Sequence, residues 1–195
     1  MRELILKMSM SVDGFVSDLE GTNTWMYGSD AESQAWTVEV ISNASLHIMG
    51  ARSFLAMAPF WPTSDLVFAA PMNEIPKAVF SRRGLAILKD VKTPARTRPG
   101  GESWAKAYVA SGDLREEIAT LKAQDGKPIV AHGGATFARS LVAQGLVDQF
   151  VLAVHPVALG KGLPLFSDLS APMPLKLVSS KAFPAGAMAQ VYRPA

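Results

Sequence analysis

Three short segments of the chain combine glycine, hydroxyl and arginine residues in the pattern of phosphate-binding turns. Glycine lets backbone N–H groups approach a ligand closely, and a guanidinium group can contact two phosphate oxygens at once. A helix that begins at such a turn adds unpaired N–H groups and a partial positive charge. Taken alone, the paired glycines are better explained as a tight turn and Ser81-Arg82 as a polar strand exit, and Arg52 is at least as well explained as an exposed arginine that pairs with a surface acid. The three segments are Gly50-Ala51-Arg52-Ser53, Ser81-Arg82 and Gly133-Gly134-Ala135-Thr136.

Each of these segments follows a short apolar run that predicts a strand, and two of them lead into helical spacing. Strands are expected at residues 4–8, 46–49, 77–80, 107–109, 127–131, 147–156, 175–180 and 188–192. Helices are expected at residues 30–43, 52–57, 113–122 and 135–142, with Ser29 or Asp30 capping the first and Asp113 the third. Four prolines within residues 58–76 predict a long loop or a broken helix.

Strands that alternate with helices predict an α/β fold with a largely parallel sheet, and the last two strands predict an antiparallel addition at one edge. The carboxyl ends of parallel strands meet at one edge of the sheet, where ligands gather. We therefore expect the three segments to lie close together. Two or more phosphates separated by a nucleoside would use all of them, so a dinucleotide is the ligand that the pattern favours.

The motifs also occur in the order of a known family. They are Ser11-Val12-Asp13-Gly14-Phe15, Trp25, Met49-Gly50-Ala51-Arg52-Ser53-Phe54, Val79-Phe80-Ser81-Arg82, Asp113-Leu114 with Leu121-Lys122, His132-Gly133-Gly134-Ala135, Gly145-Leu146-Val147-Asp148, and the block from Pro156 to Phe166. Together they resemble the dihydrofolate-reductase-like superfamily. The closest resemblance is to bacterial proteins similar to the reductase domain of the bifunctional riboflavin-biosynthesis enzyme, and it covers nearly the whole chain.

This resemblance implies a three-layer fold, with helices flanking a central, mostly parallel sheet, as a single domain over residues 1–195. It implies an NADPH-dependent reductase. Gly50, Arg52 and Ser53 resemble the first phosphate-binding turn of that family, and Ser81 and Arg82 resemble the pocket for the adenosine 2′-phosphate. A positive charge there favours NADP, because NAD-specific sites generally place an acid on the ribose. The pyrophosphate loop is implied at Gly133, Gly134, Ala135 and Thr136.

The substrate implied is a small heterocycle or a ribosylamino-pyrimidine, as for a 5-amino-6-(5-phosphoribosylamino)uracil reductase of riboflavin biosynthesis. Folate reductases carry a buried carboxylate on their first helix, and here Asp30, Glu32 and Glu39 sit in no matching motif. Ala51 stands where many relatives have a second arginine, and Ser53 replaces a commoner threonine. The alternatives are a dihydrofolate reductase and a nucleotide-binding module without turnover.

Four residues are candidates on the substrate side. Asp13 and His132 could donate a proton, although Asp13 could instead hold a turn and His132 could be a core or rim histidine. Trp25 could form an aromatic wall for a planar ring or simply close the core. Lys161, between two glycines, could approach a substrate phosphate or belong to a plain hairpin turn.

Composition limits the other classes of function. The 195 residues hold 19 Lys+Arg against 17 Asp+Glu, a net charge of +2 that predicts no nucleic-acid partner. No stretch approaches the roughly 18 uncharged apolar residues of a spanning helix. With no cysteine, and with His47 and His155 expected to be structural, we predict no metal site. We expect a cytoplasmic enzyme that acts on a small molecule and forms a homodimer through its apolar C-terminal strands.

Overall fold

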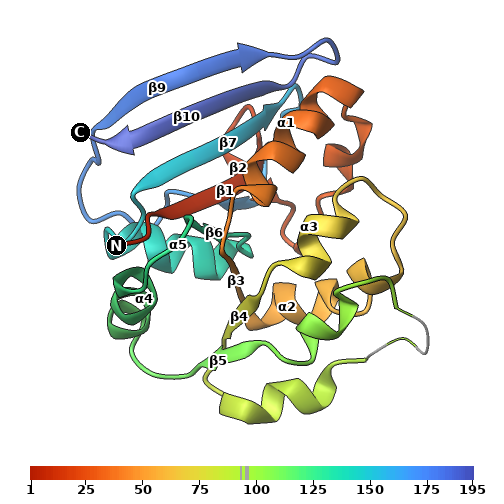
Figure 1. The fold of residues 1–195 in the computed structure, drawn as a ribbon. Helices are drawn as coiled ribbons and strands as arrows, with labels where there is room; N and C mark the ends of the chain where they lie inside the picture. Colours follow the sequence, from red (N-terminus) through yellow and green to blue (C-terminus); the bar gives the residue numbers. More distant parts are fainter. Residues whose placement is uncertain (93, 95–96) are drawn as a thin grey trace.

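An eight-stranded sheet with helices on both faces forms the core of the molecule (Figure 1). The computed structural model describes residues 1–92, 94 and 97–195. The strand order is β5-β4-β3-β6-β1-β7-β10-β9. Six strands are parallel: β1 (Leu4–Ser11), β3 (Leu46–Gly50), β4 (Lys77–Phe80), β5 (Tyr108–Ala110), β6 (Ile129–Ala131) and β7 (Gln149–His155). The antiparallel edge is formed by β10 (Met188–Pro194) and β9 (Leu175–Ala182). The predicted fold class is confirmed.

Two layers of helices cover the sheet. One face carries α1 (Ala31–Ser42), α2 (Ala51–Met57) and α3 (Ala69–Glu74), and the other carries α4 (Leu114–Ala123) and α5 (Ala135–Ala143). Asp30 caps α1 and Asp113 caps α4 by accepting hydrogen bonds from first-turn N–H groups, as the sequence predicts.

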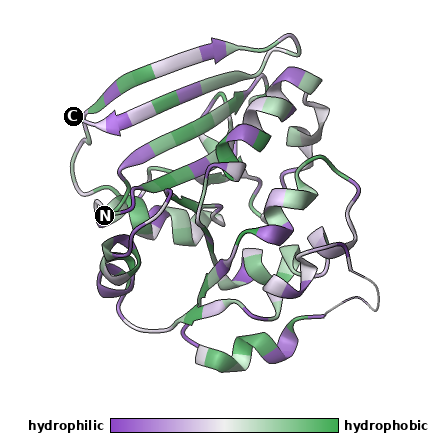
Figure 2. Cartoon of the chain, in the orientation of Figure 1, coloured by the Kyte–Doolittle hydropathy of each residue, from purple (hydrophilic) through white to green (hydrophobic). Residues whose placement is uncertain are grey.

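The middle strands are apolar because both of their faces are covered. Leu4 and Leu6 of β1 are fully buried against α4 and α5, whereas Ile5 packs under α1 on the opposite face. Figure 2 shows these strands as hydrophobic over most of their length, while the coil of α4 is largely hydrophilic. A second cluster, which includes Phe54 and Trp104, fills the space below α2 and α3.

Short elements complete the fold, and the sequence pattern predicted few of them. Strands β2 (Phe15–Ser17) and β8 (Leu163–Pro164) form a small antiparallel pair. The described residues also form four 3-10 helices, which are η1 (Thr24–Gly28), η2 (Trp61–Thr63), η3 (Gly84–Asp90) and η4 (Gly101–Trp104). Residues 58–76 contain η2 and α3, which corresponds to the broken helix of the two predicted alternatives.

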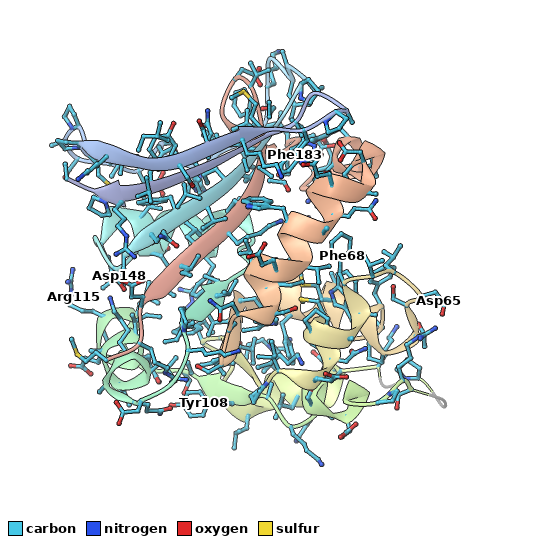
Figure 3. The ribbon with its side chains drawn as sticks, turned by 45° about the horizontal axis from the view of Figure 1, so that its top comes forward. Asp65, Phe68, Tyr108, Arg115, Asp148 and Phe183 are labelled. Atoms are coloured by element: carbon cyan, nitrogen blue, oxygen red, sulfur yellow. The ribbon has the colours of Figure 1, made fainter. Side chains whose placement is uncertain are left out.

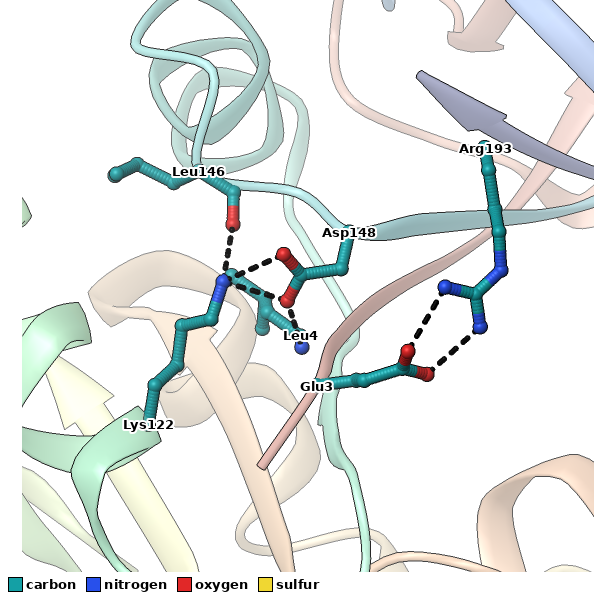
Figure 4. A network of polar contacts seen from close by, with 6 residues as sticks. All are labelled: Glu3, Leu4, Lys122, Leu146, Asp148 and Arg193. Atoms are coloured by element: carbon teal, nitrogen blue, oxygen red, sulfur yellow. Dashed lines mark hydrogen bonds and ion pairs between the residues drawn. The ribbon is translucent and has the colours of Figure 1, made fainter. Parts of the chain in front are cut away.

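Ion pairs and hydrogen bonds close the amino end of the sheet. Asp148 accepts hydrogen bonds from the Leu4 backbone N–H at 2.7 Å and from Lys122 Nζ at 2.7 Å (Figure 4). Glu3 and Arg193 make two parallel contacts of 2.8 and 2.9 Å. Figure 3 shows Asp148 at this end, far from Phe183 next to α1. In the described part of the chain, every helix is too short or too polar to cross a membrane.

Candidate active site

An open cleft of about 950 Å³ lies at the opposite end, where the parallel strands finish. It follows the carboxyl ends of β3, β4, β5 and β6, which the sheet order sets side by side. The cleft is lined by most of the residues that the sequence predicted for cofactor binding, which are Gly50, Arg52, Ser53, Ser81, Arg82, Gly134, Ala135 and Thr136. His132 also lines the cleft. Gly133, Asp13, Trp25 and Lys161 lie outside the lining.

Three helices begin at this cleft, namely α2, α4 and α5, and they differ in how their first turns are capped. α2 and α5 begin after Gly50 and Gly134, which have no side chain to cap the first turn. α1 and α4 instead use the carboxylates of Asp30 and Asp113. The first-turn N–H groups of α5 therefore remain available to an acceptor in the cleft.

The paired glycines also have a packing role. A Cβ atom on Gly134 would lie 2.8 Å from Ser53 Oγ, so the Ser53 side chain would have to turn away to admit any other residue where α5 begins beside α2. Gly133 has a φ of +80°, and its Cβ would lie 3.0 Å from Met8 Sδ. The Gly133–Gly134 peptide bond is cis. Gly133 is buried behind the cleft lining, where it packs against Met8 on the interior side of the turn before α5.

Three arginines surround the cleft, and they differ in what they already contact. Arg52 Nη2 donates to the carbonyl oxygen of Glu20 at 2.7 Å, and Arg83 pairs with Asp90 at 2.5 Å. Arg82 is exposed and makes no hydrogen bond or ion pair within the described residues. Arg82 is thus the arginine most available to a ligand. The sequence did not single out Arg83, which lines the cleft as well.

Ser81 completes the site at the end of β4. It is buried, and its Oγ accepts a hydrogen bond from the backbone N–H of Arg83 at 3.2 Å, which leaves its own hydroxyl hydrogen free to donate. Asp113 also lines the cleft, but its Oδ1 accepts from Arg115 N and Glu116 N at the start of α4. The cleft lining holds three arginines against this one acid, so the cleft has a basic character.

His132 stands at the wall of the cleft in contact with a second histidine. Its ring meets that of His47 edge to face, with the centroids 4.6 Å apart, and its Nε2 is buried without a hydrogen-bond partner. Burial holds the pKa of His132 well below its ordinary value, and the neighbouring His47, Lys7 and Lys77 lower it further. His132 is neutral at neutral pH.

His47 has the structural role that the sequence predicted for it. It is fully buried, and its Nε2 contacts the carbonyl oxygen of Ile41 at 2.9 Å near the end of α1. Burial lowers the pKa of His47 to about 4.

Asp13 is fully engaged as a hydrogen-bond acceptor. Its carboxylate accepts from Ser11 Oγ at 2.6 Å, from Leu159 N at 3.0 Å and from Gly160 N at 2.7 Å. The bonds from Ser11 and Gly160 lower the pKa of Asp13. The geometry favours the turn-holding role over proton donation. Asp13 ties the end of β1 to the loop that carries the exposed Lys161.

Trp25 is half-buried in η1, with its ring edge to face on His155 at a centroid distance of 5.3 Å. Lys7, in the middle of β1, belongs to the same region and was not predicted from the sequence. The only signal was a lysine inside an otherwise apolar run.

Among the described residues, no group of three or more His, Cys, Asp or Glu is placed to hold a metal ion.

Comparisons with known proteins show the family and the fold that the chain resembles. The model of the RibD C-terminal domain matches residues 2–189. The uncharacterized protein YyaP of Bacillus subtilis is 27% identical over 191 residues, which cover 98% of this chain and 94% of that protein. The riboflavin biosynthesis protein RibD of Corynebacterium ammoniagenes is 26% identical over 158 residues, which are 81% of this chain but 44% of that longer protein.

A solved structure shows the same fold. It is the diaminohydroxyphosphoribosylaminopyrimidine deaminase/5-amino-6-(5-phosphoribosylamino)uracil reductase of Thermotoga maritima, with a TM-score of 0.70 at 19% identity. The match covers 100% of this chain and 57% of that one.

Proposed function

The chain belongs to the RibD C-terminal domain family, and on that premise we propose that it is an NADPH-dependent reductase of a small heterocyclic substrate. The observation that carries this proposal is the single cleft that unites three sequence-distant turns with the uncapped start of α5. A dinucleotide phosphate is the ligand whose several phosphates such an arrangement would bind together.

The residues present fit this cofactor. The N–H groups at Ala135 and Thr136 would hold the pyrophosphate, while Ser81 and Arg82 would hold the 2′-phosphate. Arg52 and Ser53 border the same cleft from α2. When bound, NADPH supplies the hydride, so the protein has to orient the two reactants and exclude water.

The substrate proposed is of the ribosylamino-pyrimidine type. Folate reduction is less well supported, because the three acids of α1 and its cap are exposed or already paired. Asp30 caps α1 and accepts from Ala185 N at 3.0 Å, Glu32 pairs with Lys181 at 2.6 Å, and Glu39 is exposed. A buried free carboxylate for a cationic ring is therefore lacking in this region of the described structure.

Titration with NADPH and NADH tests the proposal. We expect the wild-type protein to bind NADPH more tightly, and the variant Arg82→Gln to lose about tenfold or more of its NADPH affinity while NADH affinity changes little. Lys176→Gln on β9, which removes one positive charge from an exposed site away from the cleft, is the matched control. Affinity for neither nucleotide would refute the reductase assignment. Tight NADPH binding without its oxidation on carbonyl, imine and pterin substrates would favour the non-catalytic module instead.

The exposed edge of the sheet supports a further proposal, that two copies of the chain pair in the cytoplasm as a homodimer. β9 ends the sheet, so one edge of it has no strand partner in the described structure. Leu177 and Val178 on this strand are 50% and 52% exposed. Free N–H and C=O groups along such an edge can pair with another strand.

A further inference from the structure

The short helix η3 carries charges at its two ends in the order that does not stabilise a helix. Arg83 precedes the first residue of η3, and Asp90 is its last residue. Acids are favoured at the N–H end of a helix and cations at its carbonyl end, because of the partial charges on the unpaired backbone groups. Lys89, in the last turn, follows this rule, and Asp90 does not. The stability of η3 therefore does not explain these two charges.

Arg83 and Asp90 contact each other across the length of η3. Arg83 Nη2 donates to Asp90 Oδ2 at 2.5 Å, and the two side chains are 51% and 50% exposed. η3 packs against β5, the strand next to β4, at the lower edge of the molecule (Figure 1). An ion pair this exposed contributes little to stability, so another anion can displace the carboxylate with little loss. The pair thus orients Arg83 without binding it firmly.

Arg83 has the position of a ligand contact. Its backbone N–H donates to Ser81 Oγ at 3.2 Å, and the N–H of Gly84 donates to the carbonyl oxygen of Ser81 at 3.1 Å, which makes a tight turn after β4. Ser81, Arg82 and Arg83 all line the cleft. Asp90 lies outside the lining. Two guanidinium groups therefore belong to this end of the cleft, and the acid that holds one of them stands behind it.

The charge of a phosphate monoester matches two guanidinium groups better than one. Such a group carries about two negative charges at neutral pH, and each guanidinium can contact two of its oxygens. Arg82 and Arg83 are consecutive and carry like charges, and Asp90 offsets one of the two. The carboxylate thus supplies, within the protein, negative charge that a phosphate dianion would supply in a complex.

We propose that Arg83 exchanges Asp90 for the ribose 2′-phosphate when the nucleotide binds, so that Asp90 is a built-in competitor that limits the affinity for NADPH. The inference rests on the proposed cofactor, and it adds an arginine and an opposing acid to the contacts of Ser81 and Arg82. NADH has a hydroxyl in place of this phosphate, and a neutral hydroxyl does not displace a carboxylate from a guanidinium. The ion pair therefore sets how strongly the cleft distinguishes the two nucleotides.

Calorimetric titration of two single variants and their combination tests the exchange. We expect Asp90→Asn to bind NADPH about threefold more tightly than wild type and Arg83→Gln to bind it at least about fivefold more weakly, with NADH affinity unchanged in both. In the double variant, the gain from Asp90→Asn should vanish. Glu32→Gln is the matched control, because it breaks an equally exposed ion pair, with Lys181, away from the cleft. It should bind both nucleotides like wild type.

The signs of these effects separate the exchange from a structural role of the ion pair. If the pair only supported η3, replacing either partner would weaken the binding of both nucleotides or leave it unchanged, and that result would overturn the proposal. A gain that persists in the double variant would show that Asp90 repels the phosphate directly, which also overturns the exchange by Arg83.

Adenosine 2′,5′-bisphosphate separates this proposal from the reductase function, because it carries the 2′-phosphate and no nicotinamide. Its affinity should change among the variants as that of NADPH does, whereas the affinity for adenosine 5′-monophosphate should stay constant. This pattern without oxidation of NADPH on any substrate would refute the reductase function and keep the exchange. NADPH binding that depends on Arg82 but on neither Arg83 nor Asp90 would do the reverse. Absence of binding for both NADPH and the bisphosphate would overturn both proposals.

Discussion

The two ends of the sheet treat the same kinds of side chain in opposite ways. At the amino end, Lys122 is paired with Asp148, which also accepts the Leu4 N–H, and Arg193 is paired with Glu3 (Figure 4). At the carboxyl ends of β6 and β4, Lys7 of the adjacent β1 and Arg82 after β4 have no such partner among the described residues. Both ends belong to one sheet, so the strand architecture itself does not account for the difference.

What differs is which end has room for a ligand. Satisfied polar groups stabilise the fold, whereas unsatisfied ones lower its stability and persist where binding requires them. The comparison predicts that substitutions at the amino end change stability without changing affinity. Substitutions at the carboxyl end should change affinity more than stability.

Acidification is expected to have the largest effect, at the buried histidine pair. The pKa of His47 is about 4 in the folded protein and near 6.5 in the unfolded protein. The burial of neutral His47 therefore has no cost to the free energy of unfolding above pH 6.5, and stability is lost as the pH falls from 6.5 toward 4. The loss from His47 alone is about 3 kcal/mol at full protonation. Urea unfolding at pH 7, 6 and 5 measures it, and His47→Gln should flatten the dependence. A free energy of unfolding that is constant over this range would contradict the assignment.

The same pH series separates the two ends. The pKa of Glu3 is lowered, chiefly by its hydrogen bond to Arg193, so its stabilisation is present above its ordinary value of 4.5 and disappears only as the pH falls below that. Lys7 and Lys77, with pKa values of about 8 and 7, titrate above the histidine window. Between pH 6.5 and 5 the histidines therefore dominate.

Removal of the carboxylate at the amino end comes next in size. Asp148→Ala leaves the Leu4 N–H and Lys122 without their acceptor, and we expect it to lower the free energy of unfolding by about 2 kcal/mol. NADPH affinity should stay the same. A denaturant titration combined with nucleotide binding checks both outcomes. Weaker NADPH binding in the folded variant would contradict the expectation that substitutions at the amino end leave affinity unchanged.

Removal of the lysine at the other end should have a smaller effect of opposite sign on stability. Lys7→Met replaces a partly buried ammonium group that has no acidic partner among the described residues, and we expect an increase of about 1 kcal/mol in the free energy of unfolding. A variant that is less stable than wild type would show that Lys7 is satisfied in the fold.

Asp13 gives a further test of the comparison, because it lies at the carboxyl end but its carboxylate already accepts hydrogen bonds from the protein. Asp13→Asn keeps most of the hydrogen-bonding shape, so NADPH oxidation should fall by less than about tenfold, whereas loss of a general acid costs about a hundredfold or more. Steady-state kinetics with a working substrate decide between these. A hundredfold fall with unchanged NADPH affinity would restore Asp13 as the proton donor.

The smallest effect on folding is expected at the exposed edge. Val178→Lys places a charge on β9 and should leave the unfolding free energy within about 0.5 kcal/mol of wild type. Light scattering should show a dimer for wild type and the 20.8 kDa monomer for the variant. A wild-type protein that is monomeric at all concentrations would reject the homodimer.

The strands and the phosphate-type turns were predictable because they depend on local patterns. Residues 77–80 show an apolar run before Ser81-Arg82, and the structure has β4 there. β2 and β8 are too short to leave a periodic pattern. The surroundings of Lys7 are set by the strands on either side of β1, which are β6 and β7, and sequence order does not reveal which strands become neighbours.

One contact at the rim links two parts of the cleft. Arg52 holds the carbonyl oxygen of Glu20, and residues of the same segment, Gly21 and Asn23, border the cleft. A phosphate that competes for this guanidinium would loosen or shift the chain just before Trp25. The indole would then report the arrival of nucleotide at a distance, and its emission offers a probe of binding that needs no added label.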